Sequence, residues 1–183
     1  MKAPHPTQKP SRRSCLGVAL AAGEGVRMRS ARPKALHEVA GRAMLAHALD
    51  ALTGAGAEQI AVVVGPDRDD VAAEARRRVA SAEIFVQGER RGTADATLAA
   101  RAAIARGFDD IVVAYADLPL ISAQTLASLR DGLAAGAGLV VLGFEAADPT
   151  GYGRLIESEG RLVAIRASAR SPCARAISTR SVR

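Results

Sequence analysis

A glycine-rich stretch near the start of the chain is the first candidate for ligand chemistry. Gly23 and Gly25 stand directly after the apolar run 16–22, and the cations Arg27 and Lys34 follow them. Glycines at the carboxyl end of a strand let backbone N–H groups approach a ligand closely, and the two cations can bind phosphate. The stretch is neither a Walker loop nor a complete dinucleotide fingerprint. A phosphate site and a structural turn therefore both remain open.

Asp117 is the second candidate, because it follows another apolar run, 110–115, and precedes Leu118-Pro119-Leu120. A carboxylate at the carboxyl end of a strand, facing a phosphate loop, is well placed for Mg²⁺. Aspartate is also common as a cap of turns and helices. The position alone leaves both roles open.

The elements that must hold these residues alternate along the chain. Short apolar runs bounded by turn residues predict strands, and several are rich in Val or Ile, as in parallel strands covered on both faces. Periodic stretches between them predict helices, including one that begins after Ser122, a good N-cap. The expected strands are 16–22, 59–64, 83–87, 110–115 and 138–144; the helical patterns are 45–52, 71–79, 94–106 and 122–133. The order predicts an α/β three-layer sandwich around a mostly parallel sheet, followed by a hairpin over 154–165.

The distribution of charge argues against a nucleic-acid partner. The net charge is +6, but residues 1–15 hold four basic and no acidic residues, and residues 166–183 hold five and none. Residues 16–165 therefore carry a net charge of −3. Phosphate tracking needs basic residues on a folded face, and aromatics for base stacking make up only 3% of the chain. The two ends are expected to be disordered basic tails.

Compartment and partners follow from similarly simple observations. Cys15 and Cys173 offer neither a disulfide framework nor metal-ligand spacing, so a reduced, cytoplasmic protein is expected. No run approaches the roughly 20 apolar residues of a membrane helix. The apolar run 16–22 follows basic residues and so resembles a signal peptide, but a buried first strand explains this run better.

Five segments together give a specific resemblance. They are 20–28, Pro33-Lys34-Ala35-Leu36-His37, Gln87–Thr93, Tyr115–Leu120 and Asp148–Arg154. The first two resemble the sugar-phosphate nucleotidyltransferases. The full set, over about 16–165, resembles the N-terminal domain of the bacterial bifunctional N-acetylglucosamine-1-phosphate uridyltransferases/glucosamine-1-phosphate acetyltransferases. The resemblance implies the Rossmann-like fold of nucleotide-diphospho-sugar transferases.

The resemblance also implies a role for each matching residue. Arg27 and Lys34 would be catalytic, holding the phosphates of UTP, and Asp117 would bind Mg²⁺. The amino sugar would lie beside Tyr115 and Gly153. The residues that would bind the nucleotide are Leu20, Ala21, Ala22, Gly23, Gly25, Gln87, Gly92 and Thr93.

The implied reaction is the transfer of uridylyl from UTP to N-acetylglucosamine 1-phosphate, which yields UDP-N-acetylglucosamine and pyrophosphate for the synthesis of peptidoglycan and lipopolysaccharide. Positioning and electrostatics carry such displacements, so no nucleophilic side chain is needed. Two alternatives stay open: a related sugar-phosphate or cytidylyl nucleotidyltransferase, and a non-catalytic nucleotide-binding remnant.

The chain also departs from the family pattern. Asp95 stands where histidine is common, Ala116 replaces the usual glycine before the metal aspartate, and Ala167 occupies the position of a sugar-binding glutamate. The pattern is lost after Ile165, and no acetyltransferase domain follows. We therefore expect one nucleotidyltransferase domain over 16–165, incomplete at its C-terminal end, with impaired activity. The trimer of the family is not expected without the acetyltransferase domain.

Overall fold

The fold of the chain comprises two compact units. The computed structural model describes residues 13–23, 25, 28, 30–89, 91–148, 150, 152–158, 161–166 and 180–182. The units divide between Ala123 and Gln124, whereas the sequence predicts one domain over 16–165.

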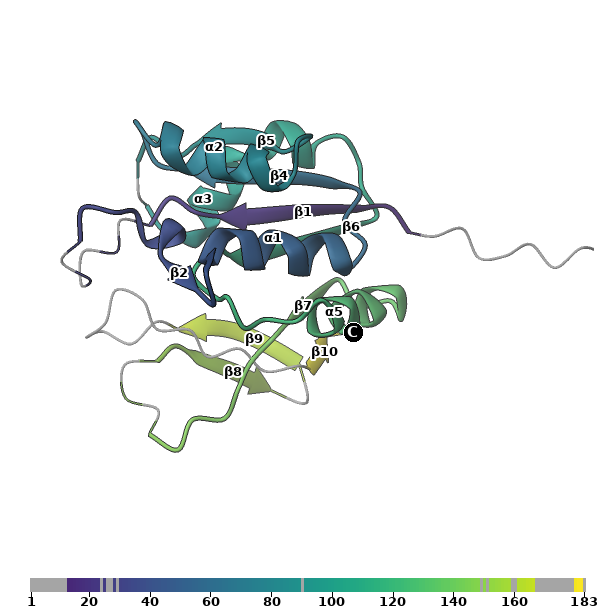
Figure 1. Cartoon of the computed structure of the whole chain (residues 1–183). Helices are drawn as coiled ribbons and strands as arrows, with labels where there is room; N and C mark the ends of the chain where they lie inside the picture. Colours follow the sequence, from purple (N-terminus) through teal and green to yellow (C-terminus); the bar gives the residue numbers. More distant parts are fainter. Residues whose placement is uncertain are drawn as a thin grey trace, which may run out of the picture. The chain divides into compact units, whose positions relative to one another are not determined.

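A four-stranded parallel sheet forms the centre of the first unit (Figure 1). Its strands are β1 (Cys15–Leu20), β4 (Gln59–Val64), β5 (Glu83–Val86) and β6 (Asp110–Tyr115). They lie in the order β5-β4-β1-β6, and every neighbouring pair is parallel. The four apolar runs expected to form these strands are confirmed, with end shifts of at most two residues.

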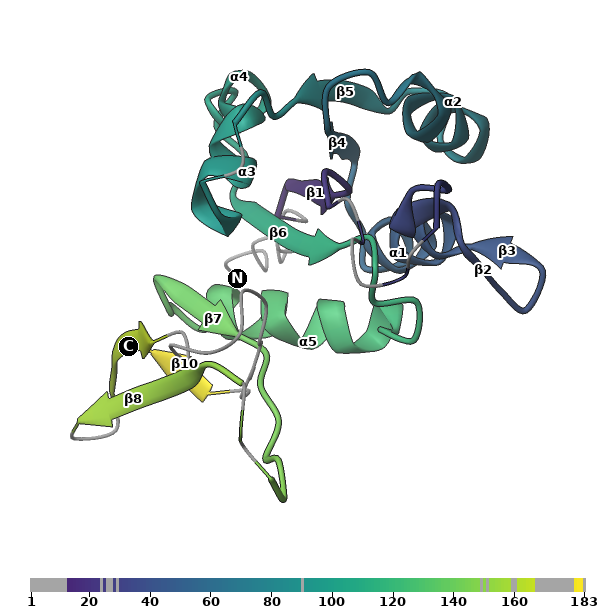
Figure 2. The same cartoon turned by 90° about the vertical axis from the view of Figure 1, so that its left-hand side faces the viewer.

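Helices cover both faces of this sheet (Figure 2). Helices α1 (Met44–Gly54) and α2 (Asp69–Arg78) lie on one face, and α3 (Thr93–Ala99) and α4 (Arg101–Ile104) lie on the other. A short helix η2 (Lys34–Leu36) and a two-stranded hairpin, β2 (Glu38–Val39) and β3 (Arg42–Ala43), precede α1. The predicted α/β layers around a parallel sheet are confirmed.

The composition of β1 explains why it occupies the centre of the sheet. All six of its residues are buried. Leu16, Val18 and Leu20 pack in one core cluster with alanines of α3 and α4. A Cβ on Gly17, which points to the other face, would stand 2.8 Å from Cδ1 of Ile60 and 3.3 Å from Cβ of Leu52. Glycine therefore allows α1 to approach the sheet closely.

The helical pattern over 94–106 forms two helices instead of one. The chain leaves helical geometry at Ala100, which has φ −88° and ψ 16° and is fully buried. Alanine periodicity predicts helix throughout this stretch, because alanine favours helix at every position. Packing of Ala100 and Ala103 against the sheet accompanies the break.

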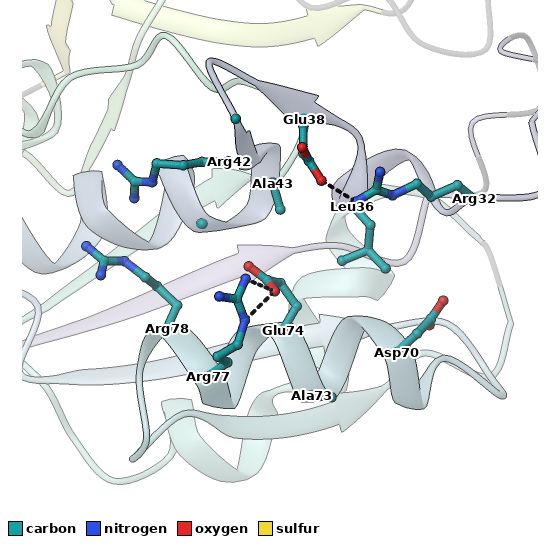
Figure 3. Close-up of a pocket in the computed structure, with 12 residues that line it drawn as sticks. Arg32, Leu36, Glu38, Arg42, Ala43, Asp70, Ala73, Glu74, Arg77 and Arg78 are labelled. Atoms are coloured by element: carbon teal, nitrogen blue, oxygen red, sulfur yellow. Dashed lines mark hydrogen bonds and ion pairs between the residues drawn. The ribbon is translucent and has the colours of Figure 1, made fainter.

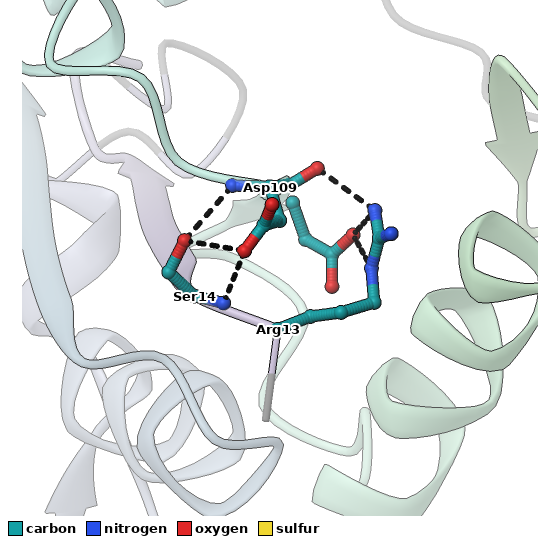
Figure 4. Close-up of polar contacts among 4 residues, drawn as sticks. Arg13, Ser14 and Asp109 are labelled. Carbon is teal, nitrogen blue, oxygen red and sulfur yellow. Dashed lines mark hydrogen bonds and ion pairs between the residues drawn. The ribbon is translucent and has the colours of Figure 1, made fainter. Parts of the chain in front are cut away.

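A polar network closes the amino edge of the sheet, where β1 and β6 begin (Figure 4). Arg13 donates from Nε and Nη2 to Oδ1 of the buried Asp110, at 3.0 and 2.7 Å. The backbone N–H and Oγ of Ser14 both donate to Oδ2 of Asp109, at 2.8 Å each. These contacts fix the relative height of β1 and β6, whose register pairs Cys15 with Asp110 and Leu20 with Tyr115.

The second unit contains a helix and two small antiparallel sheets. Helix α5 (Ala123–Ala134) begins at the boundary between the units, directly after Ser122 as predicted, and β7 (Leu139–Val141) is shorter than the expected strand 138–144. The predicted hairpin is confirmed as β8 (Arg154–Ser158) paired with β9 (Arg161–Arg166).

Part of the expected C-terminal tail is ordered into a strand. Residues Arg180–Val182 form β10, which pairs antiparallel with β7. An edge strand such as β7 exposes unpaired backbone groups, which another segment can satisfy. Residues 167–179 and 183, and residues 1–12 of the N-terminal tail, lie outside the described residues. Among the helices in the described part of the chain, none is long and apolar enough to cross a membrane.

Candidate functional site

The strand order creates a natural ligand site at the carboxyl ends of β1 and β6. From β1 the chain continues to β4 and then β5 on one side, and it returns to β6 on the other side of β1. Ligands of open α/β sheets bind where the strand order reverses in this way. The two strands end at the same height, because Leu20 pairs with Tyr115 and the Ala116 N–H donates to the Leu20 carbonyl at 3.0 Å. The glycine stretch and Asp117 leave the sheet at this point.

An ion pair joins the two segments that the sequence singled out. Nζ of Lys34 donates to Oδ2 of Asp117 at 2.8 Å, and the two side chains are 37% and 23% exposed. Lys34 is the first residue of η2, and Pro33 directly before it sets the entry into that helix. The half-exposed pair offers a cation and a carboxylate side by side at the edge of the sheet.

Gly25 brings the glycine stretch against this ion pair. Its φ is +63°, in the left-handed region that favours glycine, and its carbonyl accepts a hydrogen bond from Met28 N–H at 2.7 Å. A Cβ at this position would stand 2.8 Å from Cβ of Lys34. The glycine therefore allows the backbone at position 25 to lie directly against Lys34. Arg27, the other predicted catalytic cation, lies outside the described residues.

The residues that precede the glycines are buried in the sheet. Leu20, Ala21 and Ala22 are between 5% and 8% exposed, whereas Gly23 is exposed. The Ala21 N–H donates to the Val63 carbonyl at 2.7 Å, so the sheet already uses that donor. Of the predicted nucleotide contacts in this stretch, Gly23 is exposed and Gly25 is partly exposed, whereas the other three are buried.

A second polar cluster lies around the start of α3. Gln87, 5% exposed, follows β5, and its Nε2 donates to Oδ2 of Asp95 at 2.9 Å and to the Gly92 carbonyl at 3.5 Å. Oγ1 of Thr93 lies 2.9 Å from the hydroxyl of Tyr115, the last residue of β6. Four predicted site residues (Gln87, Gly92, Thr93 and Tyr115) are thus brought together at the carboxyl ends of β5 and β6.

Sequence reasoning missed the part that Asp95 plays in this cluster. The residue drew attention as a departure from the family, not as a partner of Gln87. It lies in the first turn of α3, where acidic residues are favourable near the helix N-terminus. An aspartate at this position is already explained by the start of the helix. The sequence therefore gives no separate signal for its hydrogen bond to Gln87.

Asp117, the predicted metal ligand, carries the type of oxygen group that binds Mg²⁺. Asp117 supplies a carboxylate, and Mg²⁺ keeps several waters and takes its other ligands from substrate phosphates. Within the described part of the chain, no three His, Cys, Asp or Glu side chains gather into a metal site. Asp117 can therefore contribute one carboxylate ligand to a divalent ion.

The predicted sugar contact Gly153 belongs to the second unit. Gly153 is buried directly before β8, and its neighbour Tyr152 packs edge-to-face on Phe144 with ring centroids 5.0 Å apart. Oδ1 of Asp148 accepts the Thr150 N–H at 2.9 Å, and this bond, with the Thr150 hydroxyl, lowers the pKa of Asp148. These contacts hold Asp148 against Thr150 and Tyr152 against Phe144, and the sugar contact of Gly153 stays a prediction.

A pocket of about 460 Å³ lies elsewhere in the first unit, between α1, α2 and the β2–β3 hairpin (Figure 3). None of the predicted site residues is among those that line it. Each of its arginines forms an ion pair, in the pairs Arg32–Glu38, Arg42–Asp50, Arg77–Glu74 and Arg78–Asp50, so that Asp50 serves two of them. A triphosphate would find no unpaired cation among these lining residues.

Comparison with known proteins agrees with the resemblance seen in the sequence. The model of the MobA-like NTP transferase domain matches residues 17–182. Curated relatives named bifunctional protein GlmU include those of Nitrobacter hamburgensis, 61% identical over 157 residues, and Xanthobacter autotrophicus, 61% identical over 156 residues. These alignments cover 86% and 85% of this chain, which spans 35% of the length of either relative.

Solved structures agree on the fold. A Bacillus anthracis structure that carries the name glucose-1-phosphate thymidylyltransferase superposes with a TM-score of 0.68 at 20% identity, over 91% of this chain and 70% of that one. The Mycobacterium tuberculosis protein Rv0371c superposes with a TM-score of 0.54 at 27% identity, over 68% of this chain and 63% of that one.

Proposed function

The chain belongs to the MobA-like NTP transferase family, and from this premise we propose that it transfers uridylyl from UTP to N-acetylglucosamine 1-phosphate. The nucleotide and the sugar in this proposal come from the resemblance to the bifunctional GlmU proteins. The observation that carries it is the Lys34–Asp117 pair at the point where the strand order reverses.

In the proposed reaction, an oxygen of the sugar phosphate forms a bond to the α-phosphorus of UTP. The bond from that phosphorus to the oxygen that bridges to the β-phosphate breaks, and pyrophosphate leaves with the electron pair. Such displacements need positioned charge more than covalent help from the protein. A lysine and a carboxylate at the sheet edge meet that need.

Lys34 and Asp117 have different electrostatic roles in this proposal. The ammonium of Lys34 would turn from the carboxylate to the phosphates, where it stabilises the negative charge that builds up on the α-phosphoryl oxygens. Asp117 would hold Mg²⁺, whose charge, when bound, neutralises the phosphates further. Arg27 is the predicted second cation of this set.

In this proposal, residues around α3 and β6 bind the uracil and the sugar. Gln87 would hydrogen-bond the base, with Gly92 and Thr93 beside it. Tyr115, whose hydroxyl is bonded to Thr93, would lie toward the sugar. The cytoplasmic location also stays a prediction.

The test is a product assay on the purified chain. UTP or CTP is incubated with N-acetylglucosamine 1-phosphate and Mg²⁺, and nucleotide-sugar and pyrophosphate are quantified by chromatography. UDP-N-acetylglucosamine formed with an equal amount of pyrophosphate supports the proposal. Preference for CTP would favour a cytidylyltransferase, and UTP binding without any product would favour a nucleotide-binding protein that lacks turnover.

A further inference from the structure

We infer that Asp95 is a positioning residue that sets the preference for uracil over cytosine by fixing the side-chain amide of Gln87. The inference rests on the proposed function, since it deepens the role of Gln87 in binding a nucleotide. Oδ2 of Asp95 lies 2.9 Å from Nε2 of Gln87, on a side chain that is 5% exposed.

The chemistry of the carboxylate decides which way the amide of Gln87 faces. An ionised carboxylate can only accept hydrogen bonds, so the NH₂ group of Gln87 must face Asp95. Rotating the amide by 180° would place its carbonyl oxygen against the carboxylate and lose a charge-assisted bond. The Gly92 carbonyl, 3.5 Å from Nε2, accepts on the same side.

The fixed orientation leaves the carbonyl oxygen of Gln87 as the group that can meet a base. Uracil carries an N–H donor at N3, between two carbonyl acceptors. Cytosine has a bare acceptor nitrogen at N3. The carbonyl oxygen of Gln87 can therefore accept a hydrogen bond from N3–H of uracil. It repels N3 of cytosine, because both atoms are acceptors and neither carries a hydrogen. Thymine shares the N3–H, so this contact does not separate uracil from thymine.

Contacts of both its backbone and its side chain hold Gln87 in place, so its amide cannot adapt to another base. Its backbone N–H donates to the Val64 carbonyl at 2.9 Å, which continues the β4–β5 ladder one residue beyond β5. The main chain is thus held by the sheet and the side chain by α3. A side chain so buried can move little to suit another base.

The experiment compares UTP and CTP dissociation constants, measured by calorimetry with Mg²⁺, for the full chain and its variants. Asp95→Asn lets the amide of Gln87 face either way, because an asparagine can donate or accept. We expect the preference for UTP over CTP to fall about tenfold, which is the weight of one hydrogen bond to a charged group. Asp69→Asn, an exposed aspartate in the first turn of α2, is the matched control and should leave the preference unchanged.

A second background separates positioning from simple structural support. If Asp95 acts through Gln87, Asp95→Asn should change the preference no further once Gln87→Ala is present. A fall of equal size in both backgrounds would overturn the inference, as would an unchanged preference in Asp95→Asn or Asp95→Ser. Circular dichroism shows whether each variant is folded, and Asp95→Ser serves if the asparagine variant is not. Failure of the wild-type chain to bind UTP would instead refute the proposed function, and this inference with it.

Discussion

The ammonium of Lys34 lies 2.8 Å from the carboxylate of Asp117, although 83 positions separate the two residues in the sequence. The pair satisfies both charges while no nucleotide is bound. Binding of phosphates and a divalent ion at this edge would therefore replace one ion pair by two new ones. The first two predictions concern this exchange.

Replacing Asp117 should separate the binding of the divalent ion from the binding of the phosphates by Lys34. In Asp117→Asn we expect Mg²⁺ to lose its effect on the thermal stabilisation by UTP, because the carboxylate that would hold the metal is gone. UTP without Mg²⁺ should stabilise the variant at least as much as the wild type, since Lys34 no longer has this partner. The free protein should lose at most about 1 kcal/mol, the range of partly exposed ion pairs. Thermal melts with and without Mg²⁺ measure all three, and an unchanged Mg²⁺ effect would contradict the metal role.

Replacing Lys34 should weaken UTP binding more than folding. A charge-assisted contact to phosphate contributes roughly 1.5–3 kcal/mol, so Lys34→Ala should raise the dissociation constant of UTP by at least about tenfold. Arg76→Ala removes a positive charge from the exposed face of α2 and is the control for overall charge. Calorimetric titration gives both constants. A large drop in melting temperature of unliganded Lys34→Ala, with UTP affinity retained, would identify Lys34 as a structural residue.

Replacing Gly25 tests whether the glycine stretch positions Lys34. Alanine at φ +63° costs roughly 1–2 kcal/mol, and its Cβ would press on Cβ of Lys34 at 2.8 Å. Gly25→Ala should therefore lower both the melting temperature and the affinity for UTP. Gly88→Ala, at a loop position where a Cβ meets nothing within 4 Å, should leave the melting temperature unchanged. Equal affinities for UTP in the wild type and Gly25→Ala would show that the close contact is dispensable.

Acid should destabilise the fold through carboxylates that are hydrogen-bonded or ion-paired in the folded state. The Ser14 backbone N–H and hydroxyl lower the pKa of Asp109, and Arg106 lowers the pKa of Glu83. Partial burial raises the pKa of Asp50, but hydrogen bonds from Arg78 and Arg42 outweigh it, and the net shift is downward.

A carboxyl whose folded pKa is depressed stabilises the fold above its unfolded pKa, and that stability is lost as the pH falls through the folded value. The ordinary pKa values are 3.8 for the two aspartates and 4.5 for Glu83. The free energy of unfolding should thus be nearly level down to about pH 5 and fall below it. Urea titrations between pH 7 and 3 measure this. Ser14→Ala keeps the backbone N–H that contributes most to the shift of Asp109 and removes only the hydroxyl, so it should flatten the acid limb slightly. An identical limb in both proteins would exclude the contribution of the hydroxyl.

Local patterns in the sequence predict the central sheet of the first unit. Apolar runs with dense Val and Ile indicate strands buried on both faces, and β4 and β6 have the predicted ends. The hairpin of β8 and β9 was equally predictable, because two short runs flank a turn. Such patterns report local backbone preference and burial, which neighbouring residues fix.

Other elements depend on contacts between distant segments or are too short to show a pattern, so they could not be predicted from the sequence. The β2–β3 hairpin has only two residues in each strand, too few for a period to show. The break at Ala100 depends on packing against the sheet, and β10 depends on an edge that β7 offers 39 to 43 residues earlier in the chain.

The candidate site shows the same division. Glycines, cations and an aspartate after apolar runs could be read from the sequence, because each follows a strand. That Lys34 pairs with Asp117 follows from β6 lying beside β1, with β4 on the other side. That Asp95 holds Gln87 follows from the packing of α3 against β1 and β4, because β5 is the next strand beside β4. Strand order and helix placement come from the burial of whole faces against one another, and no local spacing encodes which two faces will meet.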